Sequence, residues 1–212
     1  MKRTDLKVPY QEKDHAKSLG AKWDSTNKVW YVPDGISVDP FSKWIPKENY
    51  NIKADKFYLA RSTYSCWSCN KDTFVFSIAV PPTALFLEYD EGEETEEWIP
   101  NIHNNPTFVS YLSAMTINVE NTIKKLAPRY HSDFSKTVNT TYWMNHCEHC
   151  GMKQGDFGLH QEVDSPFFPI SESQAELLEF LEINEPIQCN GDGYGNYSSN
   201  MDELFEMFNL TD

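Results

Sequence analysis

Four of the five cysteines form two pairs with the same spacing. Cys66 and Cys69 make the first CxxC pair, and Cys147 and Cys150 make the second. Two thiolates three residues apart can converge on one metal ion while the chain reverses direction, and a residue that tolerates a positive φ then follows the second cysteine. An asparagine follows the first pair and a glycine follows the second. The spacing therefore predicts a zinc site held by all four thiolates.

One structural zinc ion (Zn2+) is the cofactor that this ligand set favours. Four thiolates fill a tetrahedral shell, whereas a catalytic zinc keeps one position open for water. Disulfides are disfavoured in a chain expected to be cytoplasmic, and a redox dithiol normally opens a helix rather than following a strand. His146 or His149 could replace one cysteine as a ligand. The fifth cysteine, Cys189, is expected to be a small buried hydrophobic side chain.

Strand-forming residues flank both pairs. Stretches rich in β-branched and aromatic residues lie on either side of each pair, at 57–64, 73–80, 138–144 and 157–161. Each CxxC pair is therefore expected to cap a β-hairpin. The interval between Cys69 and Cys147 is 77 residues, far more than the roughly 15–20 residues of a compact four-cysteine site. We interpret the excess as an inserted subdomain.

The insertion, about 81–137, is expected to be helical apart from one acidic loop. Asn105-Pro106 marks the start of one helix, and Ala127-Pro128 marks the end of a second. The apolar positions assigned to these helices are Phe108, Val109, Leu112 and Met115 in the first, and Val119, Ile123 and Leu126 in the second.

Two more helices are expected near the C-terminus. Ser171 and Gln174 have the spacing of a capping box, and a last helix begins near Asn200. The apolar side of the helix that follows Ser171 is assigned to Ala175, Leu177, Leu178 and Leu181. Between the two helices, the glycine-rich segment 191–195 lacks a lysine and is expected to be a loop rather than a phosphate site.

The charge is divided unevenly along the chain. The formal net charge is -14, but residues 1–61 carry +4 and residues 62–212 carry -18. Such acidity argues against a protein that coats duplex DNA through phosphate neutralisation. Seven acidic residues lie within 88–97, a run expected to be a solvated loop. The candidate acidic face for a protein partner consists of Glu91, Glu93, Glu94, Glu96 and Glu97.

The first fifty residues predict one small module. Leu6 and Val8 alternate around a lysine and indicate a strand, Pro9 suits the start of a helix, and Gly20 ends it. Two short stretches, 22–24 and 28–32, then indicate a hairpin. The predicted order is strand, helix, hairpin.

The module resembles a known bacterial family. The residues that carry the resemblance include Leu6-Lys7-Val8-Pro9-Tyr10, Leu19-Gly20-Ala21-Lys22-Trp23-Asp24, Lys28-Val29-Trp30-Tyr31-Val32-Pro33 and Trp44-Ile45-Pro46. Over residues 1–46 the chain resembles domain of unknown function 5710. That family occurs beside plasmid primase-like and other DNA-associated regions, so the resemblance implies a link to nucleic acid. It implies no catalytic residue.

Two interpretations of the module's aromatic residues stay open. A module this small needs bulky anchors, so the aromatic side chains could simply be its core. Alternatively, they form a basic, aromatic face that stacks unpaired bases. The candidate nucleic-acid face consists of Lys22, Trp23, Lys28 and Trp30.

The expected architecture is an α+β protein of two domains. Residues 1–50 form the small basic, aromatic-rich strand–helix–hairpin module. Residues 51–212 form an acidic, zinc-ribbon-like β body with an inserted helical subdomain and C-terminal helices. The sequence has no run of about 18 apolar residues and no apolar segment behind its basic start, which predicts a cytoplasmic protein without membrane contact.

Three classes of function remain. The first prediction is a non-catalytic, zinc-stabilised bacterial binding protein whose acidic body engages a basic protein partner, as an inhibitor, immunity or adaptor protein does. The alternative is an accessory protein that binds single-stranded DNA or RNA through its N-terminal module. An enzyme is disfavoured because the sequence has no GxxxxGK[ST], GxGxxG, GxSxG or HExxH motif.

Overall fold

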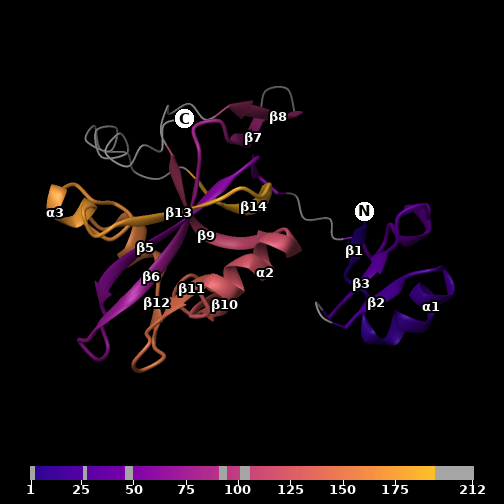
Figure 1. Ribbon diagram of the computed structural model, residues 1–212, viewed down its shortest axis with the longest axis horizontal. Helices are drawn as coiled ribbons and strands as arrows, with labels where there is room; N and C mark the ends of the chain where they lie inside the picture. Colours follow the sequence, from indigo (N-terminus) through magenta and orange to yellow (C-terminus); the bar gives the residue numbers. More distant parts are fainter. Residues whose placement is uncertain (1–2, 26–27, 46–49, 91–94, 101–105, 194–212) are drawn as a thin grey trace. The chain divides into compact units, whose positions relative to one another are not determined.

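The computed structural model describes residues 3–25, 28–45, 50–90, 95–100 and 106–193. The chain divides into two compact units, Met1–Asn49 and Tyr50–Asp212, which Figure 1 traces from indigo to yellow. The boundary expected from the sequence lies at residue 50.

The first unit has the predicted order of strand, helix and hairpin. Its elements are β1 (Thr4–Leu6), η1 (Tyr10–Glu12), α1 (Lys13–Ser18), β2 (Lys22–Asp24), β3 (Val29–Val32) and η2 (Asp39–Phe41). The strands form an antiparallel sheet in the order β1-β3-β2. Gly20 follows the helix with a φ of 106°, a conformation that favours glycine. Leu6, Val32, Phe41 and Trp44 are buried in a small core.

The second unit is built around one large antiparallel sheet. Its eight strands run in the order β13-β5-β6-β9-β14-β4-β7-β8, and a separate sheet has the order β10-β11-β12 (Figure 1). The strands are β4 (Ile52–Ala54), β5 (Phe57–Ser65), β6 (Asp72–Val80), β7 (Leu85–Asp90), β8 (Thr95–Pro100), β9 (Thr107–Met115), β10 (Tyr130–Ser135), β11 (Thr140–His146), β12 (Lys153–Gln154), β13 (Glu179–Ile183) and β14 (Ile187–Asp192). The helical elements are α2 (Ile117–Leu126), η3 (Phe157–Gln161) and α3 (Glu172–Ala175).

Both faces of the large sheet are covered. Side chains alternate along β5, so Phe57 and Leu59 enter one core while Tyr58 and Ala60 enter the other. The first core also holds apolar residues of α2, β10 and β11, and the second holds residues of η3, α3 and the segment between them. The sheet is thus buried on two sides, which explains why residues 57–60 of β5 and residues 78–80 of β6 are uninterrupted apolar runs.

The inserted segment is mainly β structure, so the predicted helical insertion is wrong in its first part. The helix expected after Asn105-Pro106 is strand β9, which pairs with β6 and β14 inside the large sheet. The second helix is confirmed as α2, where Val119 and Ile123 are buried. Leu126, assigned to the same apolar side, is exposed.

The reason for the error in β9 is a bulge. Ser110 pairs with Asp192 and Ala114 pairs with Asn190, so β9 has two residues more than β14 over this stretch. Tyr111, inside the bulge, has a φ of 48°. The irregularity brings Val109 and Leu112 into the same core. Buried residues three positions apart are typical of a helix, so the sequence pattern of this strand resembles that of a helix.

The acidic run is not one loop, contrary to expectation. Glu88 belongs to β7 and Glu96 and Glu97 belong to β8, and the two strands pair with each other. The candidate residues Glu91, Glu93 and Glu94 lie outside the described residues. Glu96 and Glu97 are exposed. Because β8 is at the end of the large sheet, charged side chains there also discourage pairing with another chain's strand.

The C-terminal part of the described chain differs from the sequence prediction. The side-chain oxygen of Ser171 accepts a hydrogen bond from the N–H of Gln174, as the capping motif predicts, but α3 has only one turn. Leu181, assigned to that helix, lies on β13, which pairs with the edge of β5. Ion pairs of Glu179 with Arg61 and of Glu182 with Lys56 support this pairing. The helix expected near residue 200 lies outside the described residues.

Two shorter segments also differ from expectation. Residues 157–161, expected to be a strand, form the single π-helical turn η3, and β12 takes the place of the predicted strand. Gly191, expected in a loop, belongs to β14, where an added Cβ would lie 2.5 Å from Val109 Cγ1. Only glycine fits at this close approach of two strands. None of the helices among the described residues has the length and apolar character needed to cross a membrane.

Candidate functional site

The four cysteines of the two CxxC pairs meet at one point. Their sulfur atoms all lie within 4.8 Å of one another, and both the Cys66–Cys150 and the Cys69–Cys147 sulfur pairs are 3.7 Å apart. A tetrahedral zinc ion with Zn–S bonds of about 2.3 Å requires sulfurs about 3.8 Å apart. A disulfide would bring two sulfurs to about 2.05 Å. The described cluster therefore has the dimensions of a metal site and not of two disulfides.

The two cysteine loops repeat the same backbone geometry. Asn70 and Gly151, which follow the second cysteines, have φ values of 55° and 72°, as the sequence predicts. The N–H of Asn70 donates to the carbonyl of Cys66 over 2.8 Å, and the N–H of Gly151 donates to that of Cys147 over 2.9 Å. Each loop reverses the chain at the end of a hairpin, which aims its two thiols at the same point.

Hydrogen bonds tie the β5–β6 hairpin to the β11–β12 hairpin. The N–H of Glu148 donates to Thr73 Oγ1 over 3.0 Å, while the Glu148 carboxylate accepts from the N–H of Phe74. In addition, the Trp67 indole N–H donates to the carbonyl of Lys153 over 2.8 Å. These contacts cross between the hairpins beside the sulfurs. They explain how two cysteine pairs separated by 77 residues are brought together.

The surroundings of two of the thiols favour the thiolate form that binds metal. Burial of Cys147 disfavours its thiolate, but the N–H groups of Cys150 and His149 and the neighbouring thiols outweigh burial and lower the pKa of Cys147 to about 6. The pKa of Cys66 is also lowered, because backbone N–H groups outweigh its burial. Gln154 Nε2 donates a further hydrogen bond to Cys66 Sγ over 3.3 Å. Donors of this kind orient and stabilise metal-bound thiolates.

The two histidines next to the second pair are engaged elsewhere. His146 is buried and stacks on His131 with ring centroids 3.9 Å apart, and its Nε2 lies 3.2 Å from Asp133 Oδ2. His149 Nε2 lies 2.8 Å from the carbonyl of Asp72. Cys189 is fully buried in the main core, where burial raises its pKa to about 12. The described cluster thus uses four cysteines and neither histidine.

The first unit carries a separate groove of about 870 Å³. Trp23 and Trp30 pair directly across the β2–β3 hairpin, with ring centroids 5.6 Å apart. Trp23 is 49% exposed, whereas Phe41 and Trp44 are buried in the core. The residues lining the groove are Leu6, Lys7, Val8, Pro9, Tyr10, Lys13, Trp23, Lys28, Val29 and Trp30. Some of the module's aromatic residues are therefore core anchors, and others line an open surface.

Cationic side chains lie beside the aromatic rings of this groove. Lys13 Nζ is 3.8 Å from the centre of the exposed Tyr10 ring, and Lys28 is exposed at the tip of the hairpin with a φ of 52°. Lys22 pairs with Tyr31 in the ladder, and because neighbouring strand residues point to opposite faces, it lies on the face away from Trp23. The structure therefore brings together three of the four predicted residues and leaves Lys22 out.

Comparison with known proteins finds matches to the first unit. Residues 3–46 match the model described as "Domain of unknown function (DUF5710)". Two curated relatives, both named DNA primase TraC of Escherichia coli, are 57% and 52% identical over 42 residues. This stretch is 20% of the present chain and 3% and 4% of the relatives, so the chain spans a very small part of their length. No solved structure matches the chain. The family match covers all the residues that line the groove.

Asp156 is a buried acid that the sequence analysis did not identify. Its Oδ2 accepts the N–H of Tyr111 over 2.6 Å, and its Oδ1 has no hydrogen-bond partner among the described residues. Burial raises the pKa of Asp156 to about 7, and the Tyr111 N–H opposes this rise. The bulge in β9 frees the N–H that Asp156 accepts. No local sequence signal marks such a pair, because its members are 45 residues apart.

We expect Asp156→Asn to remove part of the pH dependence of folding. The folded protein keeps a proton on Asp156 that the unfolded chain releases near its ordinary pKa of about 4, so stability falls as pH rises from about 4 to about 7. Asparagine cannot ionise and retains an acceptor for Tyr111. The measurement is urea unfolding of both proteins at pH 5 and pH 8. The unfolding free energy of the variant minus that of the natural protein should be about 2 to 3 kcal/mol larger at pH 8 than at pH 5. Parallel pH profiles would contradict the assignment.

Proposed function

We propose that the first unit binds single-stranded nucleic acid through the groove containing Trp23 and Trp30. The observation that carries this proposal is the exposure of Trp23, beside Trp30 and at a groove with three lysines, in a unit whose core already has Phe41 and Trp44. Base stacking on such rings contributes about 1–3 kcal/mol per base and tolerates any sequence. Lysines at the same groove can neutralise backbone phosphates.

The comparisons support DNA as the nucleic acid. The relatives matched by this chain are named DNA primases, and we take from that name only that DNA is the first probe to use. The positive balance of residues 1–61 agrees with this choice, whereas the strongly acidic remainder of the chain does not favour DNA binding there.

We further propose that the four-cysteine cluster of the second unit holds one structural zinc ion. The sulfur separations and the N–H donors to the thiolates support this ligand set. Four thiolates would fill the coordination shell and leave no site for a reacting water. The ion would then fasten the β5–β6 hairpin to the β11–β12 hairpin, and its binding free energy would be part of the folding free energy.

Salt dependence tests the groove. Binding of a labelled thymidine 20-mer, followed by fluorescence anisotropy, should weaken with salt, with a slope in the double-logarithmic plot of about -0.7 per neutralised phosphate. Lys28→Ala should reduce the magnitude of this slope by about 0.7, because one phosphate contact is lost. The matched control is Lys22→Ala, on the opposite face of the hairpin, which should leave the slope unchanged. Equal effects of the two variants, or equal affinity for duplex DNA, would contradict the proposal.

The acidic body as a surface for a basic protein partner remains a prediction. Glu96 and Glu97 are exposed on the edge strand β8, which is compatible with charge steering of a cationic partner. The same exposure also protects the sheet edge, so these residues favour the protein-partner function less specifically than the groove favours nucleic acid. The expectation of a non-catalytic protein likewise remains a prediction.

A further inference from the structure

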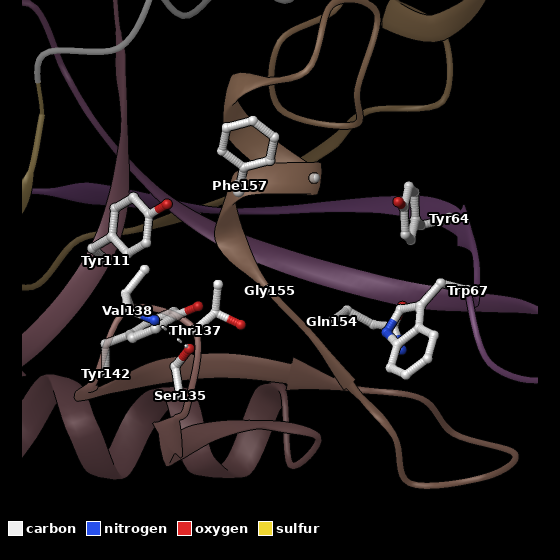
Figure 2. Close-up of a pocket in the computed structure, with 11 residues that line it drawn as sticks. Tyr64, Trp67, Tyr111, Ser135, Thr137, Val138, Tyr142, Gln154, Gly155 and Phe157 are labelled. Atoms are coloured by element: carbon white, nitrogen blue, oxygen red, sulfur yellow. Dashed lines mark hydrogen bonds between the residues drawn. The ribbon is translucent and has the colours of Figure 1, made fainter.

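A second cavity lies in the Tyr50–Asp212 unit beside the cysteine cluster (Figure 2). Its volume is about 220 Å³, which is below the 300–1,000 Å³ of pockets for drug-sized ligands and suits one ring system. Figure 2 shows Tyr111 and Tyr142 on one side, Tyr64 and Trp67 on the other, and Phe157 above the space between them. Five of the eleven lining residues are therefore aromatic, and they come from both cysteine hairpins, η3 and the bulge of β9.

Two of the wall residues are unusually exposed for their size. Trp67 is 62% exposed and Phe157 is 59% exposed. Neither residue belongs to a core cluster among the described residues. Aromatic rings that are exposed beside a cavity are available to stack on a ligand ring.

Gln154 supplies an unused hydrogen-bond acceptor in the cavity wall. The side chain is 1% exposed, and its Nε2 donates to Cys66 Sγ and to the carbonyl of Met152. Because both of these partners are acceptors, the orientation of the amide is determined and Oε1 is the remaining atom. Oε1 has no hydrogen-bond partner among the described residues. A buried acceptor without a donor is unfavourable by about 1–3 kcal/mol, so a ligand N–H that reached it would be strongly favoured.

The shape and charge of the cavity narrow the ligand class. Gly155 forms part of the wall. A Cβ added to it would contact one described atom, the Tyr142 hydroxyl oxygen, at 3.6 Å. Glycine thus keeps the space open. None of the described residues that line the cavity is charged, which disfavours a phosphate or carboxylate inside it. Lys136, exposed between the lining residues Ser135 and Thr137, could meet such a group outside.

We propose that this cavity binds one nucleobase. A nucleobase is planar, uncharged and of the right size, and each of the common bases carries an N–H donor on its pairing edge that could bond to Gln154 Oε1. Stacking would come from the exposed Trp67 and Phe157 rings. For the base to reach the buried Gln154 Oε1, the Trp67 ring must move, which breaks its indole N–H bond to the carbonyl of Lys153. The base would come either from a free nucleoside or from an unpaired position in a single strand. The site is distinct from the groove of the first unit and does not depend on it.

The test uses the full chain with Trp23→Ala, so that the first unit contributes little to binding. Calorimetric titrations with adenosine, guanosine, cytidine and uridine are compared with titrations with a mixed-sequence single-stranded 12-mer. We expect at least one of these probes to bind, and Gly155→Val, which fills the cavity, to weaken that binding at least tenfold. Phe157→Ala should weaken it several-fold and is the second variant if Gly155→Val unfolds. Phe134→Ala, an exposed aromatic residue that does not line the cavity, is the matched control.

The outcomes separate the two sources of the base. Nucleoside binding that Gly155→Val abolishes and Lys136→Ala leaves unchanged would support a free nucleoside. Binding of the 12-mer alone, weakened by both variants, would support a base within a strand. The inference is overturned if no probe binds to millimolar concentration, or if binding is indifferent to both Gly155→Val and Phe157→Ala. If Trp23→Ala leaves binding of the 12-mer unchanged but Gly155→Val weakens it, the proposed function is contradicted and this inference is supported.

Discussion

Replacement of Cys147 by serine should remove the metal and unfold most of the second unit. Cys147 is fully buried, and its sulfur lies 3.7 Å from that of Cys69. Structural zinc contributes about 10–16 kcal/mol of apparent binding free energy at neutral pH, which is comparable to or larger than the whole stability of a typical domain. Elemental analysis should therefore show loss of zinc, and the cooperative thermal transition of the second unit should disappear.

The matched control for this variant is Cys189→Ala. Cys189 is also fully buried but belongs to the main core and not to the cluster. It should keep one zinc ion per chain and lose about 1 kcal/mol of stability from the missing sulfur. The first unit should remain folded in both variants, because its core is separate. Stoichiometric zinc in Cys147→Ser would contradict the four-thiolate site.

Replacement of Trp23 by alanine should reduce single-stranded DNA binding by about 5- to 150-fold. This range corresponds to the loss of about 1–3 kcal/mol when one stacking ring is removed. Because Trp23 is about half exposed, its truncation should change the stability of the first unit much less than truncation of the buried Trp44 would. Anisotropy titration of the labelled 20-mer measures the effect.

Two variants identify the cause of that loss. Trp23→Phe keeps an aromatic face and should retain most of the affinity, whereas a purely structural contribution would be disturbed by both changes. Lys22→Ala, on the opposite face, should bind like the natural protein. If Trp23→Ala binds the 20-mer with unchanged affinity, the groove does not stack bases and the proposed function fails.

The local features of this protein were predictable. Each cysteine loop depends on a stretch of about six residues, in which the CxxC spacing and the residue of positive φ act together. Helix α2 is also determined locally, because Pro128 lies two residues after its end and cannot continue it. The strand, helix and hairpin of the first unit depend on local signals in the same way. In these segments the interactions that determine the conformation lie close together in the sequence.

The prediction was wrong where distant segments determine the conformation. Phe108, Val109, Leu112 and Met115 have helical spacing, but β9 is a strand because β6 and β14 pair with its two sides and Tyr111 accommodates a bulge. In the same way, Leu181 lies in β13 because the open edge of β5 offers a ladder. Backbone pairing with a distant strand outweighs the weak intrinsic preference of a short segment.

The sequence by itself determined the metal-binding residue types, the turn chemistry around them and the aromatic, basic character of the first unit. Tertiary structure alone decided that the two cysteine pairs share one point and that Lys22 faces away from Trp23. It also buried Gln154 and Asp156, each with one oxygen that has no hydrogen-bond partner in the described part of the chain. The physical reason is that ligand chemistry and chain reversal are properties of neighbouring residues. Burial, by contrast, and the sharing of one site by distant loops are created only when the sheet brings those loops together.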